Sequence, residues 1–553
     1  MLVIGLWHLD RGGMWGDESV TFLVGRRTVP QIWRLLHSVD AVHGLYYLFM
    51  HLVLTVRADE VALRLPSVCG AAVSAGLVGV LGLRLAGPRV GLWSGLLYAC
   101  TPLIGHYAQE GRSYAIVSAG VIGSTLLLVT GLEAAPSTRP WPWRRYGAVL
   151  AVTCLLHEFA VLAVCAHAVT LLLARAPRRV WLGWGRAVVA VGVVLAPLAW
   201  VSHGQVGQVG WLVAPDRDKA EELVRALAVT PSGVVFWTSA LLAVLGALSA
   251  RRVGAVAVPL LVLPPALLMG VSQIQPLYHE RYVLYAFAGA PLLVAAGGEW
   301  LASVVARLPL GRPRSRPASH DLPVHNGSGS DSGRPRGADV PRAKGPSASG
   351  PLSTGHASDV LVADDASPDA RRSPLPAHRP PRVPLLTLTG VLAVAVVFLH
   401  DLPLYRHDRS PAHRPENLAA VSALAARDIR PGDPVLFVPS FWRITASAYP
   451  AGFRQARDIA LGEPGASSGT LTGREVGARD VADRLARADR VWVVGDKRVL
   501  RRGTSPGDAV ERAELAALKG RFTPRWQYVS GRVALRLYVR RAPAIGSSPL
   551  GRP

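Results

Sequence analysis

The sequence predicts a helical membrane protein that carries a small soluble α/β domain near its C-terminus. Half of the 553 residues are hydrophobic and only 18% are charged, whereas ordinary soluble domains carry about 25% charged residues. Many apolar runs approach the roughly 20 residues that cross a bilayer. After residue 402 the pattern changes to short buried strands, expected at 434–439, 490–495 and 532–539, that alternate with amphipathic helices. These observations exclude a purely soluble enzyme and a disulfide scaffold.

The apolar runs predict about 11 transmembrane helices. They are rich in Leu, Val, Ala and Gly, and lipid offers no water to unpaired backbone groups, so such runs must be helical. The segment Leu2–Leu9 is too short to span and lacks the features of a signal peptide, so we interpret it as the end of a first helix. Either that helix is short or its start lies upstream. The other runs lie near residues 61–83, 91–105, 115–132, 146–156, 158–174, 186–202, 233–250, 253–272, 282–306 and 384–400.

The arginines predict which loops face outward. They cluster in alternate loops, and the positive-inside rule assigns those loops to the cytoplasm. The net charge of +23 therefore indicates cytoplasmic loops and contact with anionic membrane lipid, not nucleic-acid binding. The candidate chemistry described below lies in the opposite loops, which we expect to be extracytoplasmic. The basic loops contain Arg84 and Arg89, Arg139 to Arg145, Arg175 to Arg179, and Arg251 with Arg252.

Composition divides the chain into segments. Residues 1–307 form the predicted transmembrane catalytic domain. Of the 70 residues in 311–380, 30 are Pro, Gly or Ser and none is aromatic, so we expect a disordered cytoplasmic linker over 308–383. A last helix at 384–401 returns the chain to the outside. The α/β domain then covers 402–543 and a disordered tail covers 544–553. No GxGxxG or Walker motif follows any strand, so nothing supports nucleotide binding.

Two outward loops carry paired polar residues that are candidates for catalysis. Asp17 and Glu18 are adjacent carboxylates in a charge-poor chain; the alternative is that they cap a helix. The second loop runs from Tyr107 through Glu110 and Arg112. An Arg guanidinium matches phosphate oxygens, so Arg112 is a candidate phosphate ligand beside a carboxylate; the alternative is a local ion pair between Glu110 and Arg112.

Further candidates are histidines and an arginine at the mouths of later helices. His279 precedes Arg281 and Tyr282, a group that could instead anchor the chain at the membrane interface. His157 interrupts an apolar stretch, where ionisable residues are costly and indicate function unless a turn lets them reach water. His43 opens an amphipathic segment. A divalent metal on these histidines is conceivable, but none shows a close ligand spacing, so no metal site is assigned.

Taken together, these motifs resemble the GT-C glycosyltransferases of family 39, which include protein O-mannosyltransferase-like enzymes and lipid A aminoarabinose transferases. The resemblance covers about residues 1–305. It departs from the family pattern at the start of the Tyr-Tyr segment and in the incomplete first helix. The matching motifs are Asp17-Glu18, His43 to Tyr47, Arg64-Leu65-Pro66-Ser67, Tyr107 to Tyr114, and Arg281-Tyr282.

The resemblance implies transfer of a sugar, with mannose expected, from a polyprenyl-phosphate donor to an acceptor hydroxyl outside the membrane, with inversion. Asp17 would be the general base, supported by Glu18, and Glu110 would be a second carboxylate of the site. Arg112 and Arg281, with Tyr282, would hold the lipid phosphate. Additional substrate contacts are expected from His43, Tyr107, His157 and His279.

Two other functions compete with this hypothesis. A transporter or flippase of lipid-linked sugars would show internal repeats and ionisable residues near the membrane midplane, whereas these charges lie at outward mouths. A non-catalytic scaffold would bind a wall polymer through its outer domain alone. The acceptor stays open among a protein, a glycolipid and a wall glycan, because each presents a hydroxyl to the same base.

Overall fold

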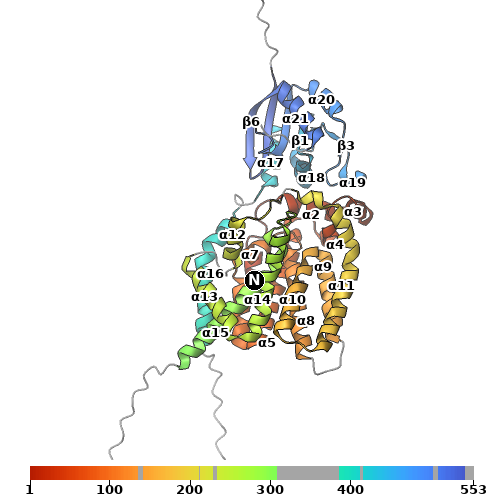
Figure 1. Ribbon diagram of the computed structural model, residues 1–553. Coiled ribbons are helices and arrows are strands. Elements are labelled where there is room, and N and C mark those ends of the chain that lie inside the picture. Colours follow the sequence, from red (N-terminus) through yellow and green to blue (C-terminus); the bar gives the residue numbers. More distant parts are fainter. Residues whose placement is uncertain are drawn as a thin grey trace, which may run out of the picture. The chain divides into compact units, whose positions relative to one another are not determined.

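The computed structural model describes residues 1–134, 141–210, 212–227, 233–307, 385–410, 415–501 and 508–541. The expected linker at 308–383 and the tail at 544–553 lie outside these residues. The ribbon shows a bundle of helices and a separate layer of strands with its own helices (Figure 1). The expected helical membrane protein with a small C-terminal α/β domain is therefore confirmed.

Each apolar run forms helix, as its composition requires in lipid. Among the described residues, six helices are long and apolar enough to cross a membrane, so the chain is a multi-pass membrane protein, and length alone identifies six of the 11 expected spans. The helices are α1 (Leu2–Leu6), α2 (Gly16–Gly25), α3 (Val29–Leu36), η1 (Ala41–His43), α4 (Gly44–Val56), α5 (Glu60–Ala86), α6 (Pro88–Ala99), α7 (Pro102–Tyr107), α8 (Tyr114–Glu133), α9 (Trp141–Leu156), η2 (Glu158–Leu162), α10 (Ala163–Leu173), α11 (Arg178–Gly204), η3 (Val206–Val209), α12 (Arg217–Leu227), α13 (Gly233–Ser249), α14 (Arg251–Val271), η4 (Glu280–Ala288), α15 (Gly289–Arg307) and α16 (Leu385–Asp408).

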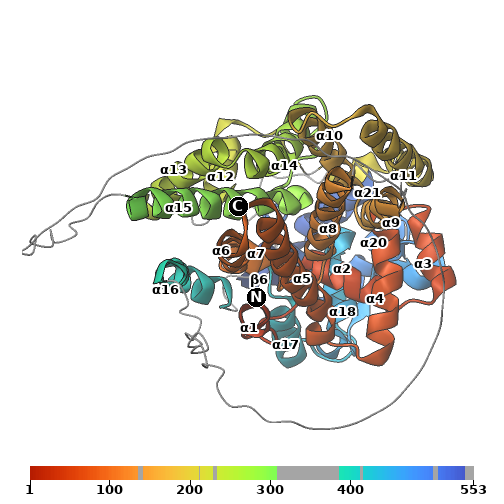
Figure 2. The same ribbon diagram turned by 90° about the horizontal axis from the view of Figure 1, so that it is seen from below.

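The helix α16 extends beyond the expected boundary at residue 401 and ends at Asp408. It lies beside α6 and α7, as the view from below shows (Figure 2). Its final turns therefore reach the outward loop that contains α7. This contact brings the base of the α/β domain close to one of the loops with candidate chemistry.

The α/β domain contains a five-stranded sheet with the order β2-β1-β5-β7-β6. The parallel pairing expected from alternating strands and helices holds for β2, β1 and β5, but β7 is antiparallel to both β5 and β6. The sequence pattern does not predict β6, because its exposed polar residues hide the alternation of a strand. The elements are α17 (Leu418–Asp428), β1 (Pro434–Val438), η6 (Ser440–Arg443), α18 (Ile444–Ala448), η7 (Pro450–Gly452), β2 (Arg457–Asp458), β3 (Leu461–Glu463), α19 (Gly465–Ser468), β4 (Arg474–Glu475), α20 (Ala478–Ala486), β5 (Arg490–Asp496), α21 (Ala509–Arg521), β6 (Phe522–Ser530) and β7 (Val533–Arg540).

Candidate active site

The two adjacent carboxylates of the first loop have different environments. Both lie in the first turn of α2, whose N-cap residue is Trp15, so Asp17 is not the helix cap. The carboxylate of Asp17 pairs with Arg281, with 3.0 Å between Oδ2 and Nη2, and its side chain keeps 29% of its exposure. Its position beside an arginine, still reachable from outside, suits a group that acts on a substrate.

Glu18 is instead fully buried against Arg64. The two side chains form a bidentate pair, with Nε–Oε1 and Nη2–Oε2 distances of 2.8 and 2.9 Å, and neither is exposed. The same Oε1 accepts a hydrogen bond from the backbone N–H of Gly111, and Arg64 donates to the carbonyl of Leu9. Glu18 thus ties the first outward loop to the second and lies away from the open side of the site.

Arg112 and Arg281 come together around Asp17, although their loops are far apart in the sequence. Arg112 donates to the backbone carbonyl of Asp17 (3.4 Å), to Thr21 (3.2 Å) and to Nε2 of His43 (2.6 Å). No ion pair joins Glu110 to Arg112 among the described residues, and Glu110 contacts His106 instead, with 3.4 Å between Oε1 and Nε2. The alternative of a local ion pair at this loop is therefore not observed.

Electrostatics around Asp17 favour its charged form. Burial by itself would raise the pKa of Asp17, but the guanidinium groups of Arg281 and Arg112 outweigh burial and hold the pKa below its ordinary value. An ionised carboxylate can accept a proton, yet a lowered pKa makes it a weaker base. Anything that engages the two arginines from the other side would make Asp17 more basic.

Aromatic rings and histidines form the wall behind the arginines. The ring of His157 lies 5.6 Å from His43, 5.4 Å from Tyr114 and 5.0 Å from Tyr282, measured between centroids. His157 is buried, so the turn in which it lies does not expose its side chain to water. The ring of His279 lies 5.8 Å from that of Tyr282. The loop of Asp17, the loop that ends at Tyr114, the turn at His157 and the segment of His279 therefore all contribute to one cluster.

Tyr107 reaches this cluster through Glu280, a carboxylate to which the sequence motifs assign no role. Its hydroxyl donates to Glu280 (3.0 Å), and Glu280 also pairs with Nδ1 of His279 at 3.1 Å. The place of Glu280 directly beside Arg281 in the sequence is the signal that could have assigned it to the site. Tyr114 was also missed as a site residue; the Arg281 guanidinium lies 5.3 Å from its ring.

Several buried polar atoms of this cluster make no hydrogen bond within the described part of the chain. Buried polar groups in native proteins are nearly always paired, so their concentration in one place indicates a site for a polar ligand. Nitrogen donors predominate, which suits an anion. The atoms are Nε of Arg112, Nε of Arg281, Nδ1 of His43, Nδ1 of His157, Oε2 of Glu110, Oγ of Ser113 and Oη of Tyr114.

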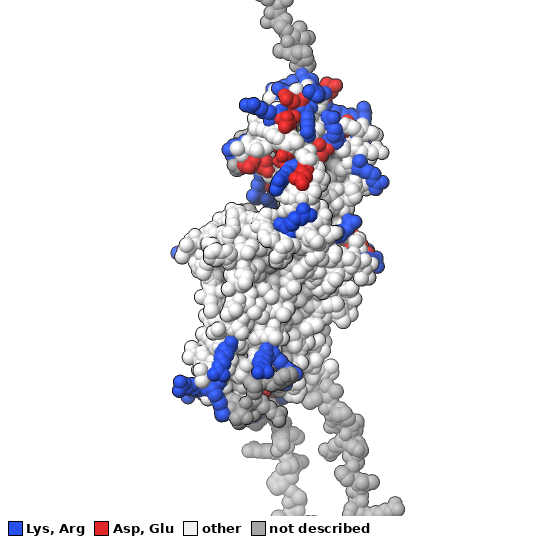
Figure 3. All heavy atoms as spheres, turned by 90° about the vertical axis from the view of Figure 1, so that its right-hand side faces the viewer, with Lys and Arg blue, Asp and Glu red and all other residues white. Residues whose placement is uncertain are grey.

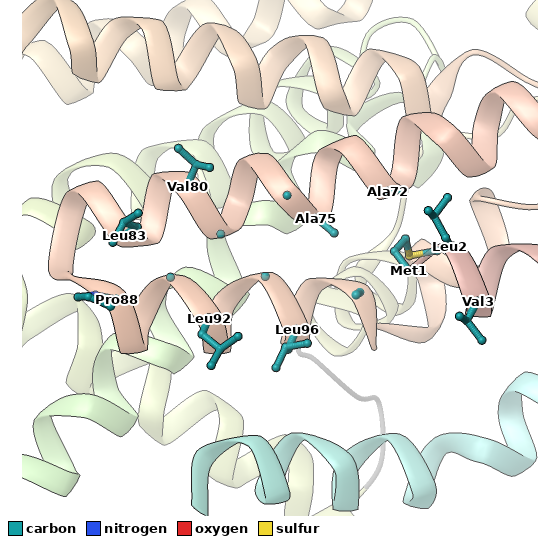
Figure 4. Close-up of a pocket in the computed structure, with 15 residues that line it drawn as sticks. Met1, Leu2, Val3, Ala72, Ala75, Val80, Leu83, Pro88, Leu92 and Leu96 are labelled. Atoms are coloured by element: carbon teal, nitrogen blue, oxygen red, sulfur yellow. The ribbon is translucent and has the colours of Figure 1, made fainter. Parts of the chain in front are cut away.

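Within the residues that the structure describes, no group of three or more His, Cys, Asp or Glu side chains could hold a metal ion. A large hollow of about 740 Å³ lies elsewhere, between α1, α5 and α6. Small and aliphatic residues such as Ala75, Val80 and Leu92 line it (Figure 4). No ionisable side chain lines it, in contrast to the Asp17 cluster.

Structural comparison identifies the fold. ArnT from Cupriavidus metallidurans in the apo state matches with a TM-score of 0.53 and 12% identity over 97% of this chain and 96% of that one. The same enzyme bound to undecaprenyl phosphate matches with a TM-score of 0.51, at the same identity and coverage. The chain has the GT-C fold. No family model and no curated protein sequence matches it. The GT-C architecture that the motifs imply is thus confirmed at the level of the fold.

Proposed function

We propose that this GT-C protein is a membrane glycosyltransferase that uses a polyprenyl-phosphate sugar as donor. The observation that carries the proposal is the convergence of Arg112, Arg281 and the ionised Asp17 in one cluster with unpaired buried donors. The likeness to ArnT, of which one structure is bound to undecaprenyl phosphate, supports a lipid phosphate as the anion.

The reaction is a single displacement. Asp17 takes the proton of the acceptor hydroxyl, the acceptor oxygen bonds to the anomeric carbon, and the bond from that carbon to the phosphate oxygen breaks. Attack from the face opposite the leaving group inverts the anomeric centre. Arg112 and Arg281 stabilise the charge that grows on the leaving phosphate, and Tyr282, Tyr107 and the three histidines line the donor. Glu110 serves as the second carboxylate, beside His106.

Donor binding also prepares the base. A phosphate bound to Arg281 offsets the positive charge of this guanidinium, so the pKa of Asp17 rises toward that of a free carboxyl and its basicity increases.

Two features support an extracytoplasmic site. Basic residues such as Arg84, Arg178 and Arg251 lie at the helix ends opposite the cluster, and one face shows Lys and Arg beyond an uncharged belt (Figure 3). The positive-inside rule places that end in the cytoplasm.

A transfer assay in reconstituted membranes tests the proposal. Radiolabelled polyprenyl-phosphate mannose and an envelope extract are given to the unmodified chain, to Asp17→Asn and to Asp10→Asn, an exposed carboxylate of the same loop. We expect label in an acceptor with the unmodified chain and the control, and a loss of at least about 100-fold with Asp17→Asn, the usual size of a general-base effect.

Two results would contradict the proposal. Full transfer by Asp17→Asn would remove Asp17 from the chemistry. Movement of the labelled lipid across the membrane, without a glycoside product from any sugar in a donor panel, would indicate transport. The same panel tests mannose, which we propose from the family resemblance, and the labelled product identifies the acceptor.

A further inference from the structure

The α/β domain contacts the loop that carries Asp17. The backbone N–H of Gly16, the residue before Asp17, donates to Oε2 of Glu416 at 3.3 Å. Two residues earlier, the N–H of Met14 donates to the hydroxyl of Tyr449 at 2.7 Å, and that hydroxyl donates to Glu60 at 2.8 Å. Residues separated by about 400 positions in the chain therefore hold the start of α2.

The sequence of this loop permits a close approach. A Cβ atom at Gly13 would lie only 2.7 Å from Cβ of Ala419, whereas one at Gly16 would make ordinary contact, 3.5 Å from the ring of Phe441 and 3.8 Å from Oε2 of Glu416. At Gly13 the loop therefore approaches the α/β domain more closely than a side chain would allow. Glu416 is only 4% exposed, so this contact is well shielded from water.

Helix α2 needs an acceptor from elsewhere at its N-terminus. Its own N-cap residue, Trp15, provides no side-chain hydrogen bond, and the first N–H groups of a helix have no intrahelical partner. The carboxylate of Glu416 fills this role, and a negative charge is favourable at this end of a helix. The orientation of the first turn, and so of Asp17, depends on a residue of another domain.

Glu416 also adds a charge beside Asp17. The groups that face Asp17 are Arg281, Arg112 and His279, and the carboxylates of Asp40 and Glu416 repel it. Glu416 itself faces Arg532, Asp17 and Asp496; burial raises the pKa of Glu416, while Gly16 N–H and Arg532 lower it. A nearby carboxylate makes Asp17 more basic, which opposes the effect of the two arginines.

We propose that Glu416 is a positioning residue for Asp17, because its carboxylate fixes the first turn of α2 through the backbone N–H of Gly16. The α/β domain is then part of the catalytic unit and not a separate binding module. This inference rests on the proposed function, since it assigns to Asp17 the part of general base.

The test compares two variants of Glu416 with a matched control. Glu416→Ala removes both the hydrogen bond and the charge, whereas Glu416→Gln keeps an acceptor oxygen and removes the charge. Asp508→Ala is the control, because Asp508 likewise accepts N–H groups at a helix start, that of α21, within the same domain. All are made in the full-length chain, and transfer is measured against pH.

We expect kcat of Glu416→Ala to fall about 10- to 100-fold with donor KM within about threefold, a pattern of misplaced catalytic groups. Glu416→Gln should recover much of that loss. Its acidic limb in kcat/KM should move to lower pH, because Asp17 without the neighbouring charge protonates only at lower pH. Asp508→Ala should match the unmodified chain both in kcat and in the position of the acidic limb.

Wild-type kcat and an unmoved acidic limb in both Glu416 variants would overturn the inference, as would an equal loss in Asp508→Ala. If even the unmodified chain transfers no sugar, the proposed function fails while the inference is still tested by hydrogen exchange. The amides of residues 14–21 should exchange faster in Glu416→Ala than in Asp508→Ala, and equal rates would refute the positioning role.

Discussion

Asp17 and Glu18 show how neighbouring residues of one type can have separate tasks. Their side chains leave the first turn of α2 in different directions, one toward Arg281 at the open side and the other toward Arg64 in the interior. Removing one partner of a buried pair leaves an uncompensated charge, which costs about 3–5 kcal/mol. Substitution at Glu18 should therefore affect folding first, and substitution at Asp17 should affect chemistry first.

Glu18→Ala is expected to lower the free energy of unfolding by about 3–5 kcal/mol, since Arg64 would stay buried without its carboxylate. Asp17→Asn should unfold close to the unmodified chain. Thermal unfolding of the purified protein in detergent, followed by intrinsic fluorescence, measures both variants side by side. An unchanged midpoint for Glu18→Ala would show that the pair does not stabilise the fold.

At the scale of elements, His106 joins α7 to the end of α16. Its Nδ1 lies 2.7 Å from Asp408 and its Nε2 lies 3.4 Å from Glu110. Burial lowers the pKa of His106, but the two carboxylates outweigh burial and raise the pKa to about 10. The imidazolium therefore stabilises the contact between the last helix and the outward loop at neutral pH.

The stabilisation from His106 should depend on pH in a defined direction. When the pKa of a group is higher in the folded than in the unfolded state, its contribution to stability is fully present below the unfolded pKa, here about 6.5. That contribution is lost as pH rises toward 10. The gap in unfolding midpoint between the unmodified chain and His106→Gln should therefore shrink over this range. His203→Gln, at an exposed ring, is the matched control for the loss of a histidine. A gap that stays constant with pH would contradict this ion pair.

The individual helices and strands were largely predictable from the sequence, whereas the contacts between distant elements were not. The apolar run at 115–132 became α8, and Arg490 to Gly495 became most of β5, because hydrophobic periodicity reports local structure. The pairing of Glu18 with Arg64 and the contact of Glu416 with Gly16 could not be predicted. They depend on how distant segments pack, and no local pattern in one sequence records that. The loops whose polar residues come together around Asp17 were nevertheless singled out, because charge in an apolar chain is costly.

The orientation of the whole molecule in the membrane can be measured with single cysteines. Asp489, 99% exposed in the α/β domain, is replaced by Cys in one variant, and Arg252, exposed at the start of α14, in another. Both are made in a background without the four native cysteines. A membrane-impermeant maleimide should label Asp489→Cys in intact cells and Arg252→Cys only after lysis. The reverse pattern would place the α/β domain in the cytoplasm.

The contacts of Gly16 with Glu416 and of Met14 with Tyr449 also set an order of events during synthesis. The ribosome releases the loop with Asp17 about 400 residues before it reaches Glu416 and Tyr449. Until the last helix has inserted and the α/β domain has folded, the start of α2 lacks its supports. Under the proposed function, a nascent chain that has not yet reached Tyr449 would thus be a poor catalyst.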